Sequence, residues 1–336
     1  MQIHLDALDG ALAADPFTGV ITMDVADARI HEQSDGFAHR ALRVPNTTDT
    51  RFAMASGSKT FTALAVMRLV EDGVLSLTTR ARSILGDDLP LIDDAVTVGH
   101  LLSHTSGIGD YLDEESDEDP AEYVLPVSAQ VLAETEAFVP VIDGYPQKFA
   151  PGERFSYCNG GFIVLALLAQ RASGRGYHEL VEEEVFARAG LRETGFLRSD
   201  DLPGDAALGY LHPAGNRTNV LQLPVRGNGD GGAYTTARDL HVFWQALGSG
   251  LIVRPDSLAE MTRPRQDVPQ ERRRYGLGMW LAPEGPELIM EGADVGVSIR
   301  STHDPLTSTT VTVISNRSGG AWSAAAALIP DHWPLP

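Results

Sequence analysis

The sequence predicts an α/β (α+β) fold, in which an antiparallel sheet is flanked by helices and carries an inserted, mostly helical lobe. Strand-like segments lie at 20–46 and again at 274–317, near the two ends of the chain. The residues between them carry mainly helical patterns and long loops. No internal repeat and no Pro- or Ser-rich linker divides the chain. We therefore expect one integrated unit with a sheet lobe from 1–75 and 226–336 and a helical lobe from 76–225.

The elements follow in order along the chain. A helix is expected at 4–14, and alternating β-branched residues predict a hairpin of strands at 20–30 and 36–46. Helical spacing predicts helices over Thr60–Asp72, closed by Gly73, over 160–174, which is apolar on nearly all sides, and over Tyr177–Ala189. Thr236 and Asp239 have capping-box spacing at the start of a further helix. Strands then follow at 274–283, 286–292, 296–304 and 308–317, and a helix at 323–333.

Composition excludes several classes of protein. The formal charge of −20 argues against binding to nucleic acid or to an anionic membrane surface, because both need a positive face. No stretch approaches the length of a bilayer span, and MQIHLDALDG lacks the basic and apolar regions of a secretory signal. A single cysteine, Cys158, excludes an internal disulfide and fits a reducing compartment. We expect a cytoplasmic protein of unknown oligomeric state.

A lysine after Ser56 stands out in a chain that prefers arginine. Lys59 and Lys148 are the two lysines among 26 basic residues. Ser56 and Lys59 are three residues apart, so on a helix that starts near Ser56 their side chains share a face. A lysine amine can take the proton of a serine hydroxyl if burial and the helix N-terminus lower its pKa, whereas arginine stays protonated. The alternative interpretation is a helix-capping serine followed by a solvated lysine.

A second candidate motif, Tyr-x-Asn, comes just before the apolar helix at 160–174. The phenol of Tyr157 can relay a proton, and the amide of Asn159 can orient a substrate carbonyl or the lysine. The alternative is an aromatic residue packed near a turn, with asparagine as a helix cap. Cys158, between them, is interpreted as a small filler that could make the site sensitive to thiol reagents.

Taken together, several segments resemble one known family. They are SGSK, LLSHTSGI, PGERFSYCNGGF, GYHELVEEEVFARAGLRETGF and GGAYTTARDL, in that order. The chain resembles the serine β-lactamase and penicillin-binding protein superfamily over roughly 15–318. The nearest branch contains class C β-lactamases, D-amino-acid peptidases and related esterases. This resemblance implies a β-lactamase/transpeptidase-like fold with the site in a cleft between the two lobes, and no organic cofactor or metal.

The resemblance also implies roles for single residues. Ser56 would be the acylated nucleophile and Lys59 its proton acceptor. Tyr157 would share proton transfer in acylation and in hydrolysis of the acyl-enzyme, and Asn159 would bind the substrate and Lys59. The Ser56 backbone N–H and one amide from an edge strand would form the oxyanion hole. The HTSG segment would shape a turn behind the site.

The third motif of the family departs from its usual form, Lys-Thr-Gly or His-x-Gly. Alignment on the following GVS places Met290, Glu291 and Gly292 there. Gly292 still permits a close approach to substrate, and Ala293 is the candidate for the second oxyanion amide. Because the cation is missing, and because Glu291 would repel a carboxylate if it pointed inward, the sequence favours neutral or cationic substrates. Arg274 and Arg300 are candidate replacements for the cation.

Other signals predict little chemistry. ASGSKT lacks the glycines of a phosphate loop, and His100 and His104 lack the glutamate of the H-E-x-x-H zinc motif. GNGDGG is not framed as a dinucleotide-binding unit and is interpreted as a turn. The segment 110–123 has eight acidic residues of fourteen. It is either a solvated loop or a lid that disfavours anionic substrates.

The sequence therefore predicts a serine hydrolase that cleaves a small ester or amide through an acyl-serine intermediate. The alternatives are a true β-lactamase or D-amino-acid peptidase acting on a lactam or peptide with another cation. A further alternative is a non-catalytic ligand-binding or sensor protein on the same scaffold. The intact set of Ser56, Lys59, Tyr157 and Asn159 favours an enzyme.

Overall fold

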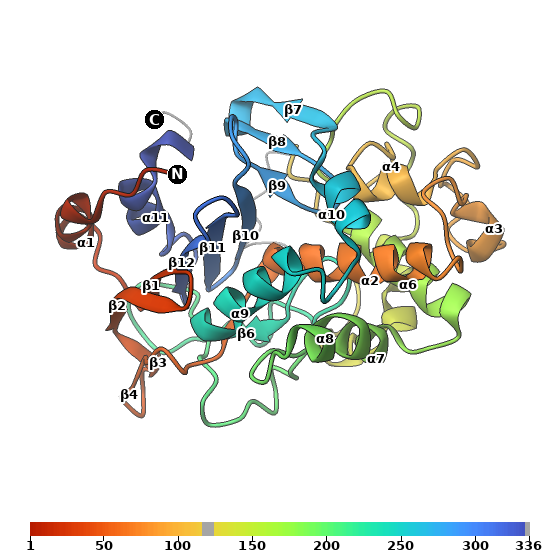
Figure 1. The fold of residues 1–336 in the computed structure, drawn as a ribbon. Helices are drawn as coiled ribbons and strands as arrows, with labels where there is room; N and C mark the ends of the chain where they lie inside the picture. The colour runs from red at the N-terminus through yellow and green to blue at the C-terminus, as the bar shows by residue number, and fades with distance from the viewer. Residues whose placement is uncertain (116–123, 333–336) are drawn as a thin grey trace.

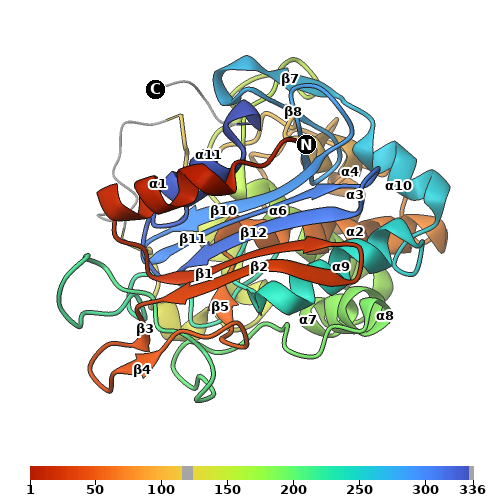
Figure 2. The same ribbon diagram turned by 60° about the vertical axis from the view of Figure 1, so that its left-hand side comes forward.

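The computed structural model describes residues 1–115 and 124–332. Within them, an antiparallel sheet of eight strands has the order β2-β1-β12-β11-β10-β9-β8-β7. The strands in that order are Ala28–Asp35, Gly19–Val25, Thr309–Ser315, Val297–Asp304, Leu288–Asp294, Trp280–Leu281, Arg273–Tyr275 and Gln266–Val268. Strand β1 pairs with β12, so strands from the two ends of the chain lie side by side in the sheet (Figure 2). The predicted fold class is confirmed.

Helices cover both faces of this sheet (Figures 1 and 2). On one face, α1 (Leu8–Ala14) and α11 (Trp322–Leu328) pack over Val311 and Val313 of β12. Ile314 points the other way, into the larger apolar cluster formed with α2 (Lys59–Glu71), α6 (Asn159–Ser173) and α9 (Ala237–Gly248). Successive residues of a strand face opposite sides, so β12 is buried on both. This burial explains its uninterrupted β-branched sequence.

The remaining helices are short and lie mainly beside α6. They are α3 (Arg82–Leu85), α4 (Val98–Leu102), α5 (Val139–Ile142), α7 (Tyr177–Val181), α8 (Ala187–Ala189) and α10 (Pro255–Thr262). The helix expected at Tyr177–Ala189 is present, with a π-helical turn at Glu182–Phe186 between α7 and α8. Helix α10 and strand β7 were not predicted. The division into lobes at 76–225 stays a prediction.

The predicted N-terminal hairpin has the wrong boundaries. Instead of strands at 20–30 and 36–46, the chain turns at Ala26, whose φ is 47°, and Ala28–Asp35 forms the second strand. Residues Phe37–His39 (β3) and Val44–Pro45 (β4) pair in a separate small sheet. The turn lacks the Asn-Gly or Asp-Gly pair that marks most tight hairpins, so the sequence pattern alone gave no indication of a turn at this position.

Other element predictions hold with shifted ends. The segment 274–283 divides into β8 and β9, the first helix begins as a 3₁₀ turn at Leu5–Ala7, and α11 ends before the predicted position 333, which lies outside the described residues. Thr236 caps α9 by accepting a hydrogen bond from the Asp239 N–H. The Asp239 carboxylate instead binds Glu193 N and Thr194 Oγ1, so the capping box is half formed. No helix within the described residues is long and apolar enough to cross a membrane.

Candidate active site

Ser56 lies in a tight turn at the entrance to α2. A short strand, Phe52–Ala53 (β5), pairs with Tyr234–Thr235 (β6) and leads into a 3₁₀ turn, Ala55–Ser58 (η2). Ala55 has a φ of 44°, a value that is uncommon for a residue with a side chain. Ser58 holds this turn by donating to Ala55 O and accepting from Ala233 N, each at 3.0 Å. The turn presents Ser56 at the cavity surface while α2 stays buried.

Lys59 is the first residue of α2, and its side chain is buried. Its Nζ lies 2.8 Å from Ser56 Oγ, 2.8 Å from Asn159 Oδ1 and 2.6 Å from Asp230 O. The amide and backbone oxygens can only accept, so each takes one N–H of the lysine. The remaining position on the nitrogen faces the serine hydroxyl. In the neutral amine this position is the lone pair, so the geometry is that of a base acting on Ser56.

Opposing effects act on the charge of this amine. Burial lowers the pKa of Lys59 below its usual value, while the charges of Asp230, Glu114 and Asp110 raise it. The first effect favours the neutral base, and the carboxylates favour the ammonium that forms when a proton arrives.

Tyr157 lies over the same nitrogen. Its ring centroid is 5.0 Å from Lys59 Nζ, and its ring stacks on Trp280 with centroids 6.1 Å apart. The His104 ring also lies close to Tyr157, with centroids 4.2 Å apart, which places the HTSG segment next to the site. Burial raises the pKa of the Tyr157 phenol well above its usual value, although the Ser56 hydroxyl acts in the opposite direction. The phenol therefore carries its proton at neutral pH.

Asn159 begins α6 and connects the lysine to the segment that follows the HTSG turn. Its Nδ2 donates to Leu112 O at 3.0 Å and to Glu114 Oε1 at 3.4 Å. The carboxylate of Asp110 accepts from the N–H groups of Asn159 and Gly160, at 2.5 and 2.8 Å, and so caps the helix. Burial raises the pKa of Asp110 to about 6. These contacts fix the direction of the Asn159 amide.

Strand β10 brings the third motif against the serine turn. A Cβ added at Gly292 would lie 2.7 Å from Ser56 N, 2.5 Å from Gly57 N and 2.4 Å from Met54 O. Only glycine fits at this distance. Met290 is buried and packs near Gly57, and Ala293 lines the cavity beside Gly292. The assignment of the Ala293 amide to the oxyanion hole stays a prediction.

Glu291 lines the cavity, but it does not act as the unpaired repulsive charge that the sequence suggested. Its Oε1 lies 2.6 Å from Arg273 Nη1 and its Oε2 lies 3.1 Å from Arg300 Nη1. Of the two expected replacements for the missing cation, Arg300 is used in this pair. Arg274 is directed elsewhere, to Ala282 O and Gly285 O. Arg273, one position earlier, is the arginine that lines the cavity.

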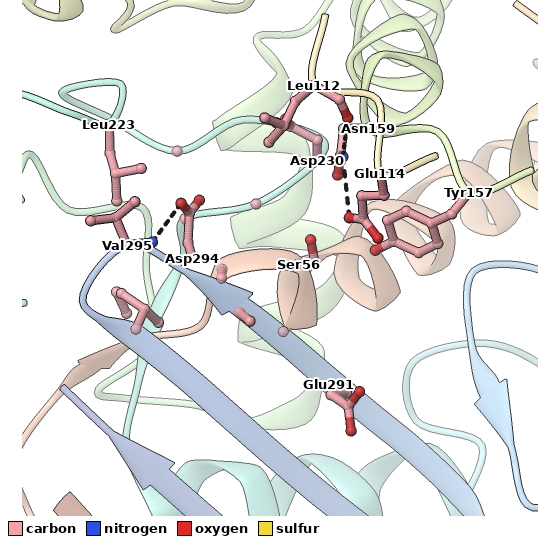
Figure 3. A pocket seen from close by; sticks show the side chains of 18 of the residues that line it. Ser56, Leu112, Glu114, Tyr157, Asn159, Leu223, Asp230, Glu291, Asp294 and Val295 are labelled. Atoms are coloured by element: carbon pink, nitrogen blue, oxygen red, sulfur yellow. Dashed lines mark hydrogen bonds between the residues drawn. The ribbon is translucent and has the colours of Figure 1, made fainter. Parts of the chain in front are cut away.

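A cavity of about 870 Å³ opens over the serine (Figure 3). Five of the predicted site residues line it, namely Ser56, Tyr157, Asn159, Gly292 and Ala293, while Lys59 lies below Ser56. Figure 3 places Ser56 between Glu114 and Tyr157 on one side and Asp294 and Val295 on the other.

Sequence reasoning singled out none of four carboxylates that line this cavity: Glu114, Asp230, Glu271 and Asp294. Asp230 belongs to the GNGDGG segment, whose glycines signalled a turn and correctly so. Asp294 ends β10, two residues after Gly292, and Glu114 lay in the acidic run at 110–123. The signal in the sequence that could have identified Asp230, Asp294 and Glu114 was their position close to the family motifs.

The beginning of the acidic run at 110–123 is held against the cavity wall. Lys148 Nζ lies 2.9 Å from Asp113 Oδ2 and 3.0 Å from Glu115 Oε2, and it donates to Ser156 Oγ. The hydroxyl of Tyr111 donates to Asp230 Oδ2 at 2.5 Å. Residues 111–115 thus form a wall of the site. The other part of the predicted lid, 116–123, lies outside the described residues.

Comparison with known proteins agrees with this geometry. The profile of the Beta-lactamase family matches residues 6–331. The chain belongs to the β-lactamase family. A solved penicillin-binding protein from Bacillus halodurans superposes with a TM-score of 0.88 at 38% identity, covering 95% of this chain and 98% of the other. The resemblance that the sequence predicted is confirmed.

Relatives within the β-lactamase family carry different activities in their names. Esterase EstB of Burkholderia gladioli is 28% identical over 83% of this chain and 78% of its own length. A D-aminopeptidase of Brucella anthropi is 29% identical over 68% of this chain and 41% of its own length. The chain spans between 41% and 61% of the length of the first curated relatives that it matches.

Proposed function

We propose that this member of the β-lactamase family is a serine hydrolase that cleaves an ester or amide bond through an acyl-serine intermediate. The observation that carries the proposal is the position of Lys59. Its nitrogen is buried, two of its hydrogen-bonding positions are taken by pure acceptors, and the third faces Ser56 Oγ at 2.8 Å. Two relatives are named an esterase and a D-aminopeptidase, which supports an ester or an amide as the bond that is cleaved.

In the acylation step, Ser56 Oγ attacks the carbonyl carbon while its proton passes to Lys59 Nζ. The phenol of Tyr157, which holds its proton at neutral pH, gives that proton to the leaving group, and the lysine restores it. In deacylation, a water takes the place of the leaving group and loses its proton to the same pair. Ser56 then leaves with a proton, which returns the enzyme to its starting state.

The negative charge on the carbonyl oxygen needs donors close to Ser56. The Ser56 N–H and the Ala293 N–H are the proposed pair, and Gly292 permits this approach because it lacks a side chain. Asn159, fixed by Leu112 and Glu114, is proposed to orient the acyl half of the substrate. The SxxK pair of Ser56 and Lys59 thus acts beside oxyanion donors and an amide whose positions are already fixed before substrate binds.

A true β-lactamase or D-amino-acid peptidase remains the second candidate, because a solved relative at 38% identity is named a penicillin-binding protein. Two observations favour a general esterase or amidase over it. Met290 is buried where the family places a cation, and Arg273 is already paired with Glu291. Mass spectrometry after incubation with a penicillin distinguishes a stable acyl adduct from turnover.

The test of the main proposal is hydrolysis of 4-nitrophenyl esters by the wild-type chain and by Ser56→Ala. We expect turnover in the wild type, labelling of Ser56 by a fluorophosphonate probe, and loss of both in the variant. An esterase rate that survives in Ser56→Ala would refute the assignment. A cytoplasmic location is also proposed, on the evidence of a single, buried, unpaired cysteine, and cell fractionation tests it.

A further inference from the structure

Glu114 and its two neighbours all line the catalytic cavity, but only the neighbours are paired with basic residues among the described part of the chain. Asp113 pairs with Lys148, and Glu115 pairs with both Lys148 and Arg154. These pairs hold the residues before and after Glu114. Glu114 itself contacts the Asn159 amide and lies beside Tyr157 in the cavity (Figure 3). This segment therefore contributes one carboxylate to the cavity that no ion pair neutralises within the described residues.

The charges that line the cavity separate into two groups. The carboxylates of Asp113, Glu115 and Glu291 are each neutralised by an arginine or lysine. Within residues 1–115 and 124–332, Glu114, Asp230, Glu271 and Asp294 form no ion pair. Glu114, Asp230 and Asp294 surround Ser56 from three separate segments. Lys59 is the nearby cation, and catalysis requires it to be neutral. A substrate entering here meets a net negative field.

No positive charge from the third motif offsets this negative field. Arg273 is the cavity's one lining arginine within the described chain, and its Nη1 is held by Glu291. An anionic substrate would have to compete with Glu291 for this guanidinium and would also face three carboxylates. A cationic group, by contrast, would gain a partner without displacing any existing pair.

We propose that Glu114 is a specificity-determining residue that selects substrates carrying a positively charged amine on the acyl group. The inference rests on the proposed function, because it assigns the acyl half of the substrate to Asn159. Glu114 shares that amide, so a cationic substituent of the acyl group reaches its carboxylate while the carbonyl lies at Ser56. Asp230 and Asp294 add to the attraction from greater distance.

Two esters of the same shape test this selection. They are 4-nitrophenyl 4-(trimethylammonio)butanoate, a permanent cation, and its neutral counterpart 4-nitrophenyl 5,5-dimethylhexanoate. Each kcat/KM is divided by the rate of the uncatalysed reaction of that ester with hydroxide. We expect the wild type to favour the cation at least tenfold. In Glu114→Gln, the ratio of the value for the cation to the value for the neutral ester falls about tenfold, whatever the substitution does to both rates through Asn159 and Lys59.

The control for overall charge is Glu182→Gln, at an exposed carboxylate at the start of the π-helical turn, which should keep the wild-type preference. If Glu114 acted only on the pKa of Lys59, Glu114→Gln would change both esters equally, and an unchanged ratio overturns the inference. Turnover of the neutral ester that Ser56→Ala abolishes, together with no preference for the cation, refutes the inference and leaves the proposed function intact. Absence of turnover for both esters refutes both.

Discussion

Substitution of Gly292 by alanine tests the placement of the oxyanion strand. An added Cβ would lie 2.4 to 2.7 Å from three backbone atoms of the serine turn, whereas ordinary contacts are about 3.5 Å or more. Since none of these atoms belongs to a flexible side chain, β10 or η2 must move by roughly 1 Å. A displacement of that size at reacting groups costs about 10²-fold in rate, or about 2.7 kcal/mol of transition-state stabilisation. Overpacking should also lower the free energy of unfolding by about 1–3 kcal/mol.

The assay is steady-state hydrolysis of a 4-nitrophenyl ester, with urea unfolding measured on the same preparations. Gly248→Ala is the matched control, because a Cβ at that final position of α9 meets no atom within 4 Å. We expect the control to keep its rate and its stability. A Gly292→Ala enzyme with the wild-type rate and unchanged unfolding would show that β10 does not approach Ser56 as described, and the oxyanion assignment would fall with it.

Three further predictions concern charge. Lys59→Arg should reduce kcat by about 10²–10⁴-fold, since arginine stays protonated, and esterase activity in a folded variant measures this. The rate should rise with pH through the pKa of Lys59, which burial places below 10.5. Glu114→Gln should move this rise to lower pH, because the carboxylate raises the pKa of Lys59. A pH–rate profile that is the same in the variant as in the wild type would contradict this electrostatic account. Glu291→Ala leaves two buried guanidiniums without their shared carboxylate, so it should lower the free energy of unfolding by about 3 kcal/mol. Urea titration measures this loss, and a variant as stable as the wild type would mean that the pairs contribute little.

The fold was largely predictable because its strongest signals are periodic. The burial of α6 follows from its apolar circumference, and Gly174 ends it in the left-handed conformation that glycine favours. The hairpin after Gly19 was misplaced because the turn at Ala26 has no glycine or asparagine. Strand β7 was missed because it is three residues long and depends on pairing with β8, whereas α10 was missed although Pro255 at its first position is a local signal for a helix start.

The candidate site was predictable where a motif fixes spacing along one element. Ser56 and Lys59 are close because one helical turn separates them, and Tyr157 and Asn159 follow from the start of α6. The charges around them come from distant parts of the chain. Arg273 was missed in favour of Arg274, because a one-residue shift along a strand reverses the face of the side chain. The ion pairs of Glu291 with two arginines depend on the register of β10 with β11, which the pattern of a single sequence does not reveal.

The setting of Lys59 explains why a buried base can coexist with so many carboxylates. A lysine surrounded only by apolar groups would lose its proton easily but would resist taking one from Ser56. Here burial lowers the pKa, and Asp230, Glu114 and Asp110 offset part of that effect without forming an ion pair with Nζ. The same charges stabilise the ammonium as it forms during attack. One arrangement of carboxylates therefore supports proton transfer and, through Glu114, favours a cationic acyl group.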